Sequence, residues 1–288
     1  MPTSSRPFPG QKHKAGDTVC LAVADIDDIR ADLVAEQEDL DVLVGGLAER
    51  DWGRSTPAEG WTVGDQIGHL TYFDAAAERA LTAPARFRAE VEAVLAEGDD
   101  FTERHLAEAR AMSSGELLGS WRRGRQDLLT AVAAADPGVR VPWYGPPMSL
   151  ASFVSARLME AWAHGQDVAD GVGTTRVPTD RLRHVAHIGV RSRPFSYIVR
   201  GREPPPEPVA VELLAPSGGR WTWEAEEAHD VVRGSALGFC LVVTQRRHVD
   251  DTDVVAEGDM AREWMQLAQA FAGPPGPGRR PGQFAPMG

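Results

Sequence analysis

Apolar side chains recur at helical intervals along the first two thirds of the chain. Between residues 25 and 50 they return every three or four positions, which predicts one long amphipathic helix (Ile26, Ile29, Leu33, Leu40, Leu43, Val44 and Leu47). The same spacing predicts three more helices (residues 62–81, 113–135 and 149–171). Four helices of this length favour an antiparallel bundle.

Local signals mark the ends of these helices and an insertion between two of them. Thr62 and Asp65 have the spacing of a capping box, and Asp136-Pro137-Gly138 stops the third helix. Residues 84–112 are charged and rich in alanine, and Gly98-Asp99-Asp100 splits them into two short helical patterns. We expect this insertion to lie over the core as a candidate lid.

The pattern changes in the last third of the chain. One more helix is predicted around residues 182–190, and a proline-rich run then precedes a β-hairpin formed by Val209–Leu214 and Trp221–Trp223. Further elements follow at intervals: a strand, a helix, a strand and a closing helix (residues 230–232, 235–244, 253–255 and 259–271). The fold class expected is therefore α+β.

The predicted elements divide the chain into two domains and two tails. A helical bundle over residues 19–178 contains the insertion 84–112, and a small α+β domain covers residues 179–272. The polar residues 1–18 and the Pro/Gly-rich residues 273–288 are expected to be disordered tails, because neither composition sustains regular structure.

Composition narrows the classes of partner. The net charge of -12 disfavours binding to nucleic acid or to an anionic membrane surface. Cys20 and Cys240 are the only cysteines, which excludes a disulfide framework and a thiolate zinc cage and suits a reducing cytoplasm. No apolar run approaches the ~18 residues of a spanning helix. We expect a cytoplasmic protein that binds a small-molecule substrate; monomer and dimer stay open.

Three residues are candidate metal ligands. Glu160 and His164 lie four positions apart, so on a helix they share one face, and His69 flanks the apolar stripe of its own helix. Two imidazoles and one carboxylate would leave coordination positions open, which distinguishes a catalytic metal site from a structural one. Asp167, three residues beyond His164, is placed to accept a hydrogen bond from that imidazole.

A simpler interpretation of the same residues is also open. A Glu and a His four apart on a helix commonly form a weak surface pair. His69 would then be a hydrogen-bonded residue at the edge of the core, and Asp167 a solvated charge.

A family resemblance favours the metal site. The segments Trp61-Thr62-Val63, Ile67-Gly68-His69-Leu70 and Glu160-Ala161-Trp162-Ala163-His164-Gly165-Gln166-Asp167 resemble the metal-binding pattern of the DinB-like superfamily, in its mycothiol-dependent maleylpyruvate isomerase branch. The resemblance implies a helical bundle that holds a divalent ion, typically zinc, through His69, Glu160 and His164. It also implies a low-molecular-weight thiol such as mycothiol as co-substrate.

The second half is similar to that branch's carboxy-terminal domain, which resembles sterol-carrier modules. The matching stretch runs from Val232 to Arg247. The resemblance places an arginine near the active site, and the closest match is Arg246, with Arg247 as the other candidate. The alternative is a basic helix end that the helix dipole stabilises.

These observations predict a metal-dependent isomerase or thiol S-transferase in which Arg246 holds a carboxylate of substrate or thiol. Two other functions stay open. A hydrolase or lyase would use water as the nucleophile and need a base such as Asp167 or His187. A carrier protein would bind an apolar ligand without using the metal. The insertion 84–112 and the Gln-Arg-Arg-His run after the matching helix depart from the family pattern, so the substrate is open.

Overall fold

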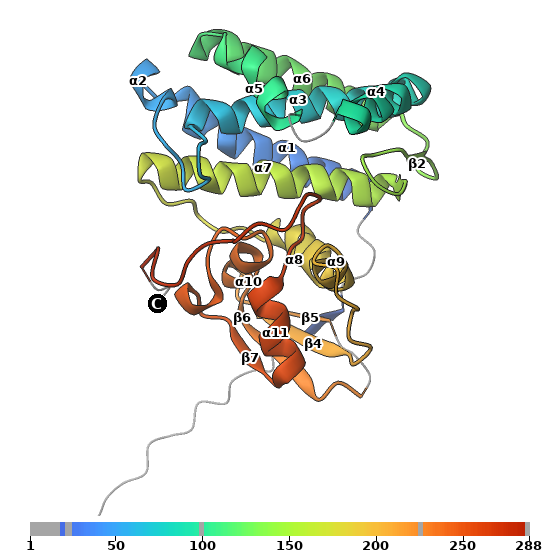
Figure 1. The fold of residues 1–288 in the computed structure, drawn as a ribbon, viewed down its shortest axis with the longest axis vertical. Helices are drawn as coiled ribbons and strands as arrows, with labels where there is room; N and C mark the ends of the chain where they lie inside the picture. Colours follow the sequence, from blue (N-terminus) through green and yellow to red (C-terminus); the bar gives the residue numbers. More distant parts are fainter. Residues whose placement is uncertain (1–17, 21–24, 98–100, 224–226, 286–288) are drawn as a thin grey trace, which may run out of the picture.

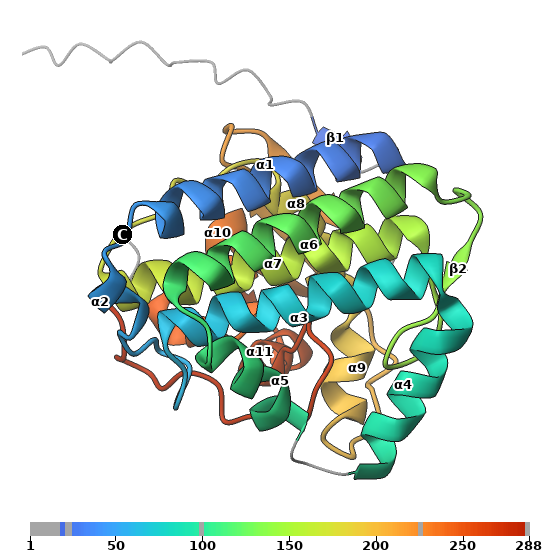
Figure 2. The ribbon, with the colours of Figure 1, turned by 90° about the horizontal axis from the view of Figure 1, so that it is seen from above.

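The computed structural model describes residues 18–20, 25–97, 101–223 and 227–285 (Figure 1). Residues 1–17, for which a disordered tail was predicted, lie outside this range. Four long helices lie side by side with their axes nearly aligned (Figure 2): α1 (Ile26–Gly45), α3 (Val63–Thr82), α6 (Ser114–Ala134) and α7 (Leu150–Val172). None of the helices in the described residues has the length and apolar character needed to cross a bilayer.

A side-chain cap marks the start of each of these helices, and the cap predicted for α3 is present. The Thr62 hydroxyl accepts from the Asp65 N–H at 3.2 Å, and the Asp65 carboxylate accepts from the Thr62 N–H at 2.8 Å, which completes the capping box. Helix α1 is shorter than the predicted helix 25–50, because the chain leaves it at Gly45 and forms a separate short helix, α2 (Glu49–Trp52).

The insertion forms two helices that pack on the long helices. Helix α4 (Pro84–Glu97) and helix α5 (Phe101–Arg110) bury Phe87 and Leu106 against the other helices. Helix α5 packs obliquely beside α3 (Figure 2), and Ala109 on α5 lies directly over Gly68 on α3. A hairpin of two short strands, β2 (Arg140–Val141) and β3 (Met148–Ser149), was not predicted and joins α6 to α7.

Among the described residues, the second half supplies four strands of a five-stranded sheet together with four α-helices, so the α+β class is confirmed. The sheet order is β1-β5-β4-β6-β7, and β4 and β5 form the predicted antiparallel hairpin. The strands are β1 (Thr18–Cys20), β4 (Val209–Leu214), β5 (Arg220–Trp223), β6 (Asp230–Ser235) and β7 (Val255–Glu257). The helices are α8 (Leu182–Arg191), α9 (Arg193–Ile198), α10 (Ala236–Val243) and α11 (Asp259–Leu267), with a 3-10 turn at Val249–Asp251.

Strand β1 was not predicted, and it connects the first described residues to the second half of the chain. It pairs in parallel with β5, so the first described residues belong to the sheet of the second half. The two halves also share one continuous apolar core, which runs from Leu158 and Trp162 on α7 to Val185 on α8 and Phe239 on α10. Figure 1 shows α7 as the helix that faces the second half.

The end of the chain differs from the disordered tail predicted for residues 273–288. Up to residue 285 it runs between the helical layer and the second half (Figure 1). The Gly282 N–H donates to the Asp251 carboxylate at 2.7 Å, and the Arg247 guanidinium lies 3.6 Å from the centre of the Phe284 ring. The segment has low helix and strand propensity, but contacts with the rest of the protein hold it in place without regular secondary structure.

Candidate metal centre

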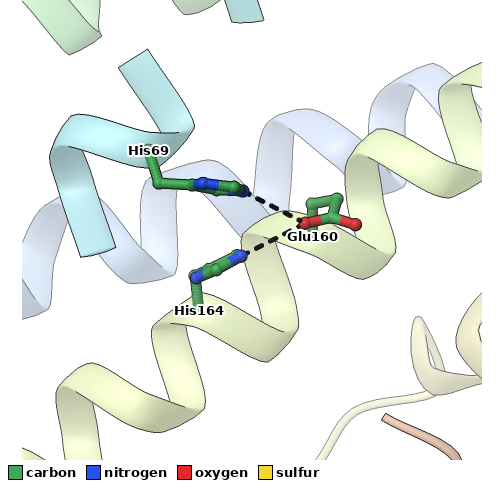
Figure 3. Close-up of side chains that lie close together, drawn as sticks. All are labelled: His69, Glu160 and His164. Atoms are coloured by element: carbon green, nitrogen blue, oxygen red, sulfur yellow. Dashed lines mark hydrogen bonds and ion pairs between the residues drawn. The ribbon is translucent and has the colours of Figure 1, made fainter. Parts of the chain in front are cut away.

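Two helices bring the three predicted ligands together (Figure 3). His69 comes from α3, and Glu160 and His164 come from successive turns of α7. Glu160 Oε2 lies 3.2 Å from His164 Nε2 and 3.8 Å from His69 Nε2. The side chains are between 11% and 22% exposed, so the cluster is largely shielded from water. A weak surface pair, the simpler interpretation of the spacing, does not describe this arrangement.

The donor atoms are spaced closely enough for one divalent cation. One ligand atom from each residue lies within 4.8 Å of the other two. Tetrahedral zinc with bonds of 2.0–2.1 Å separates its ligand atoms by about 3.3 Å, so small side-chain rotations would bring all three into range. Three ligands would leave a fourth position open.

The electrostatics favour the protonation states that a cation needs. Burial, and then the neighbouring His164, lower the pKa of His69 to about 3, so this imidazole is neutral at pH 7. Burial raises the pKa of Glu160, but hydrogen bonds with His164 and His69 outweigh burial and hold that pKa well below its ordinary value. A neutral imidazole therefore faces an ionised carboxylate.

Gln66, not Asp167, is the hydrogen-bond partner of the His164 Nδ1 atom. The His164 Nδ1 lies 2.5 Å from Gln66 Oε1, and Gln66 is fully buried. The Gln66 amide donates to the Thr56 hydroxyl at 2.9 Å, and that hydroxyl donates to the Trp61 carbonyl at 2.9 Å. This chain orients the amide so that its oxygen faces the imidazole. Nδ1 is then the donor, and Nε2 is directed towards Glu160.

The insertion contributes a partner for His69. His105 on α5 is buried, and its Nε2 lies 3.3 Å from His69 Nδ1. Aromatic rings surround the same imidazole, with the ring centres of Phe73 and Trp61 at 4.5 and 5.2 Å. The insertion, which was predicted to be a lid, is thus packed against the site and contacts the candidate ligand His69.

The other two predicted site residues meet each other beside this cluster. Arg246 follows α10, and its Nε donates at 3.2 Å to the carbonyl of Ala163, the residue before His164. Its Nη2 lies 2.9 Å from the Asp167 carboxylate, one helical turn beyond His164. Arg247 instead pairs with Asp170 at 2.7 Å. Of the two candidate arginines, Arg246 is the one bonded to the backbone next to a ligand.

Comparison with known proteins identifies relatives of this chain. The family described as Mycothiol maleylpyruvate isomerase N-terminal domain matches residues 33–169, a span that includes all three candidate ligands. Uncharacterized proteins from two strains of Mycobacterium tuberculosis are 48% identical over 249 residues, which is 86% of this chain and 97% of theirs. Residues 33–169 therefore belong to the mycothiol maleylpyruvate isomerase N-terminal domain family, and the chain as a whole is related to these two mycobacterial proteins.

Solved structures in this family share the fold. The crystal structure of a mycothiol-dependent maleylpyruvate isomerase superposes with a TM-score of 0.57 at 17% identity, over 81% of this chain and 93% of that one. A mutant of the mycothiol-dependent maleylpyruvate isomerase gives 0.56 at 16% identity. At this identity the likeness establishes a common fold. The family match confirms the resemblance that the sequence motifs indicated, and the DinB-like superfamily fits it.

Three residues of this family member were not identified from its sequence as parts of the site. Gln66 precedes His69 by three positions on α3, so helical spacing could have indicated it. His105 lies in an insertion that departs from the family pattern, and Arg279, which pairs with Asp167 at 2.7 Å, lies in a Pro/Gly-rich segment. No spacing rule connects either of these to a ligand.

Proposed function

We propose that this protein is a metal-dependent enzyme of the thiol-dependent isomerase or thiol S-transferase type. His69, Glu160 and His164 would hold the divalent ion, and zinc suits their nitrogen and oxygen donors. The convergence of these donor atoms is the observation that carries the proposal. Family membership supports a low-molecular-weight thiol, such as mycothiol, as co-substrate.

The bound ion would supply an open coordination position at which a thiol ionises near neutral pH. The protein's own residues set the conditions for that chemistry. Gln66 and His105 orient the two imidazoles, and the rings of Trp61 and Phe73 shield His69 from water. A single negative charge, that of Glu160, leaves the occupied site with a net positive charge that attracts an anionic thiol or substrate.

Arg246 would bind a carboxylate of the substrate or thiol. Its Nε donates to the carbonyl of Ala163, the residue before His164, which holds the guanidinium beside the proposed metal site. The ion pair with Asp167 fixes the plane of the guanidinium. Asp167 is then a positioning residue for Arg246. The Arg246 Nη1 also donates to the Thr244 carbonyl at 2.6 Å, so two of the five N–H groups of this planar guanidinium remain for a carboxylate.

Hydrolysis with water as nucleophile has less support, because the expected bases are occupied. Each of the two oxygens of Asp167 already has a guanidinium partner, Arg246 or Arg279. His187 Nδ1 accepts a hydrogen bond at 3.2 Å from the indole of Trp223. We therefore favour a thiol nucleophile.

The domain division is also a proposal. We infer an antiparallel four-helix bundle over residues 19–178, with the insertion 84–112, followed by a sterol-carrier-like domain over 179–272. The family match to residues 33–169 falls entirely within the first of these and supports the boundary.

Elemental analysis tests the ligand set. The purified wild type should contain close to one divalent ion per chain, and Glu160→Gln should contain little, while Glu212→Gln on strand β4 should match the wild type. Near-stoichiometric metal in the Glu160→Gln protein would reject these ligands.

Turnover tests the reaction. The metal-loaded protein should convert maleylpyruvate or another electrophilic unsaturated acid only when a thiol such as mycothiol is present. A metal-loaded protein that gives neither isomer nor thioether would reject the thiol chemistry. Unchanged binding of an apolar ligand by metal-free His164→Ala would favour the carrier function.

A further inference from the structure

A cavity of about 740 Å³ lies one helical turn from the metal centre. Its walls come from several parts of the chain: the loop before α3, the carboxy-terminal end of α7, the residues after α10, Phe271 and the segment 276–283. The last of these supplies half of the lining. The cavity therefore exists in this form only because the Pro/Gly-rich segment is docked.

Two guanidinium groups meet in this cavity on one buried carboxylate. Asp167 is 1% exposed; its Oδ2 lies 2.9 Å from Arg246 Nη2 and its Oδ1 lies 2.7 Å from Arg279 Nη2. Both arginine side chains are nearly buried. Two cations and one anion leave this wall with one net positive charge, in a protein whose net charge is -12.

Arg279 has hydrogen-bonding capacity left over. Its Nε is buried and has no acceptor within the part of the chain that the structure describes. A buried guanidinium N–H without an acceptor is costly, and an oxygen-rich group lodged beside it would remove that cost. Burial and the neighbouring Arg246 also lower the pKa of Arg279, although a guanidinium stays charged at neutral pH.

The segment is held by contacts other than Arg279. Gly282 donates to Asp251, the Phe284 ring stacks on Arg247, and the Gly273 carbonyl accepts from Gln269 at 3.1 Å. Loss of the Arg279 side chain should therefore leave the segment in place, so that binding and folding can be measured separately.

We propose that the segment 273–285 is part of the ligand site and that Arg279 is a second anion-binding residue, which together with Arg246 fixes a carboxylate of a small molecule in the cavity. Two guanidinium groups on one wall of the cavity, with one net positive charge between them and Asp167, favour a ligand with one or two carboxylates over a neutral one. The inference rests on the proposed function only in taking this ligand to be the substrate or thiol, because anion binding itself needs no metal.

Calorimetric titration with maleate, a small dicarboxylate, tests the proposal. The full-length chain should bind maleate and not the neutral fumaramide, with and without metal. Arg279→Ala should weaken maleate binding about tenfold or more, because a charge-assisted hydrogen bond is lost. Arg279→Lys should keep part of the affinity, and Arg262→Ala, which removes an exposed arginine on α11, should match the wild type.

Two outcomes would overturn the proposal. One is equal maleate affinity in wild type and in Arg279→Ala that has a wild-type circular dichroism spectrum; the other is no maleate binding by the wild type. A chain ending at residue 273 should also lose maleate binding while keeping its metal content. If the wild type binds maleate through Arg279 but contains no metal, the proposed function fails and this inference stands. If the wild type contains metal but does not bind maleate, this inference fails and the proposed function stands.

Discussion

Replacing Gln66 by leucine should weaken metal binding without touching any ligand. The amide oxygen of Gln66 lies 2.5 Å from His164 Nδ1, and its amide nitrogen is fixed by Thr56. Leucine fills a similar volume but accepts no hydrogen bond. The imidazole of His164 then loses the acceptor that keeps its proton on Nδ1 and leaves Nε2 free for the proposed metal ion.

The magnitude follows from the burial of both partners. Loss of such an outer hydrogen bond costs about 10- to 100-fold in metal affinity, or about 1.4–2.7 kcal/mol. Because Gln66 is fully buried and His164 is 8% exposed, water cannot readily replace the amide. The buried imidazole N–H would also stay unsatisfied, which should lower the free energy of unfolding of the metal-free protein by about 1–3 kcal/mol.

Competition with a chromophoric chelator measures the zinc dissociation constant of each variant. Gln37→Leu is the matched control: it removes another buried amide, on α1, whose oxygen has no hydrogen-bond partner among the described residues. Its zinc affinity should equal that of the wild type. Gln66→Glu keeps an acceptor at the same place and should bind zinc at least as tightly. A folded Gln66→Leu protein with wild-type affinity would refute the orienting role of Gln66.

Two further predictions concern stability. A Cβ on Gly68 would lie 2.5 Å from Ala109 Cβ, so Gly68→Ala should push α5 away from α3 and lower the free energy of unfolding, measured in urea, by about 1–2 kcal/mol. The Gly68→Ala, Ala109→Gly double variant should recover this stability. A Gly68→Ala protein as stable as the wild type would contradict the prediction. In metal-free protein, His69 has a folded pKa of about 3 against an ordinary 6.5, so the unfolded chain takes up its proton first and stability falls as the pH falls. Between pH 7 and 5 the unfolding free energy should drop about 2 kcal/mol more in wild type than in His69→Gln, and parallel profiles would disprove it.

The position of the candidate centre has a simple structural reason. Glu160 and His164 are adjacent on α7, the helix that packs against both α1 and the second half, while His69 sits on α3 across from it. Ligands on two packed helices keep a fixed separation, which is what a metal site requires. The arginines that complete the surroundings come from the second half and from the end of the chain.

Local sequence determined most of the helices and the candidate ligands. Apolar periodicity and the Thr62 and Asp65 capping box are properties of a few neighbouring residues, so the amino-acid sequence alone is enough to predict the helices that they mark. The Glu160 and His164 pair follows in the same way from a spacing of four on one helix. Strand β1 had no such signal, because three residues acquire strand structure only by pairing with β5, about 200 positions later.

Tertiary structure alone decided the partners of the site residues. Asp167 lies one turn from His164, yet its oxygens bind two guanidiniums, and the imidazole bonds Gln66 across the helix interface. His105 and Arg279 reach the site from an insertion and from a segment whose composition predicted disorder. Spacing along a helix determines which side chains share a face, but the packing of distant segments determines which atoms that face meets.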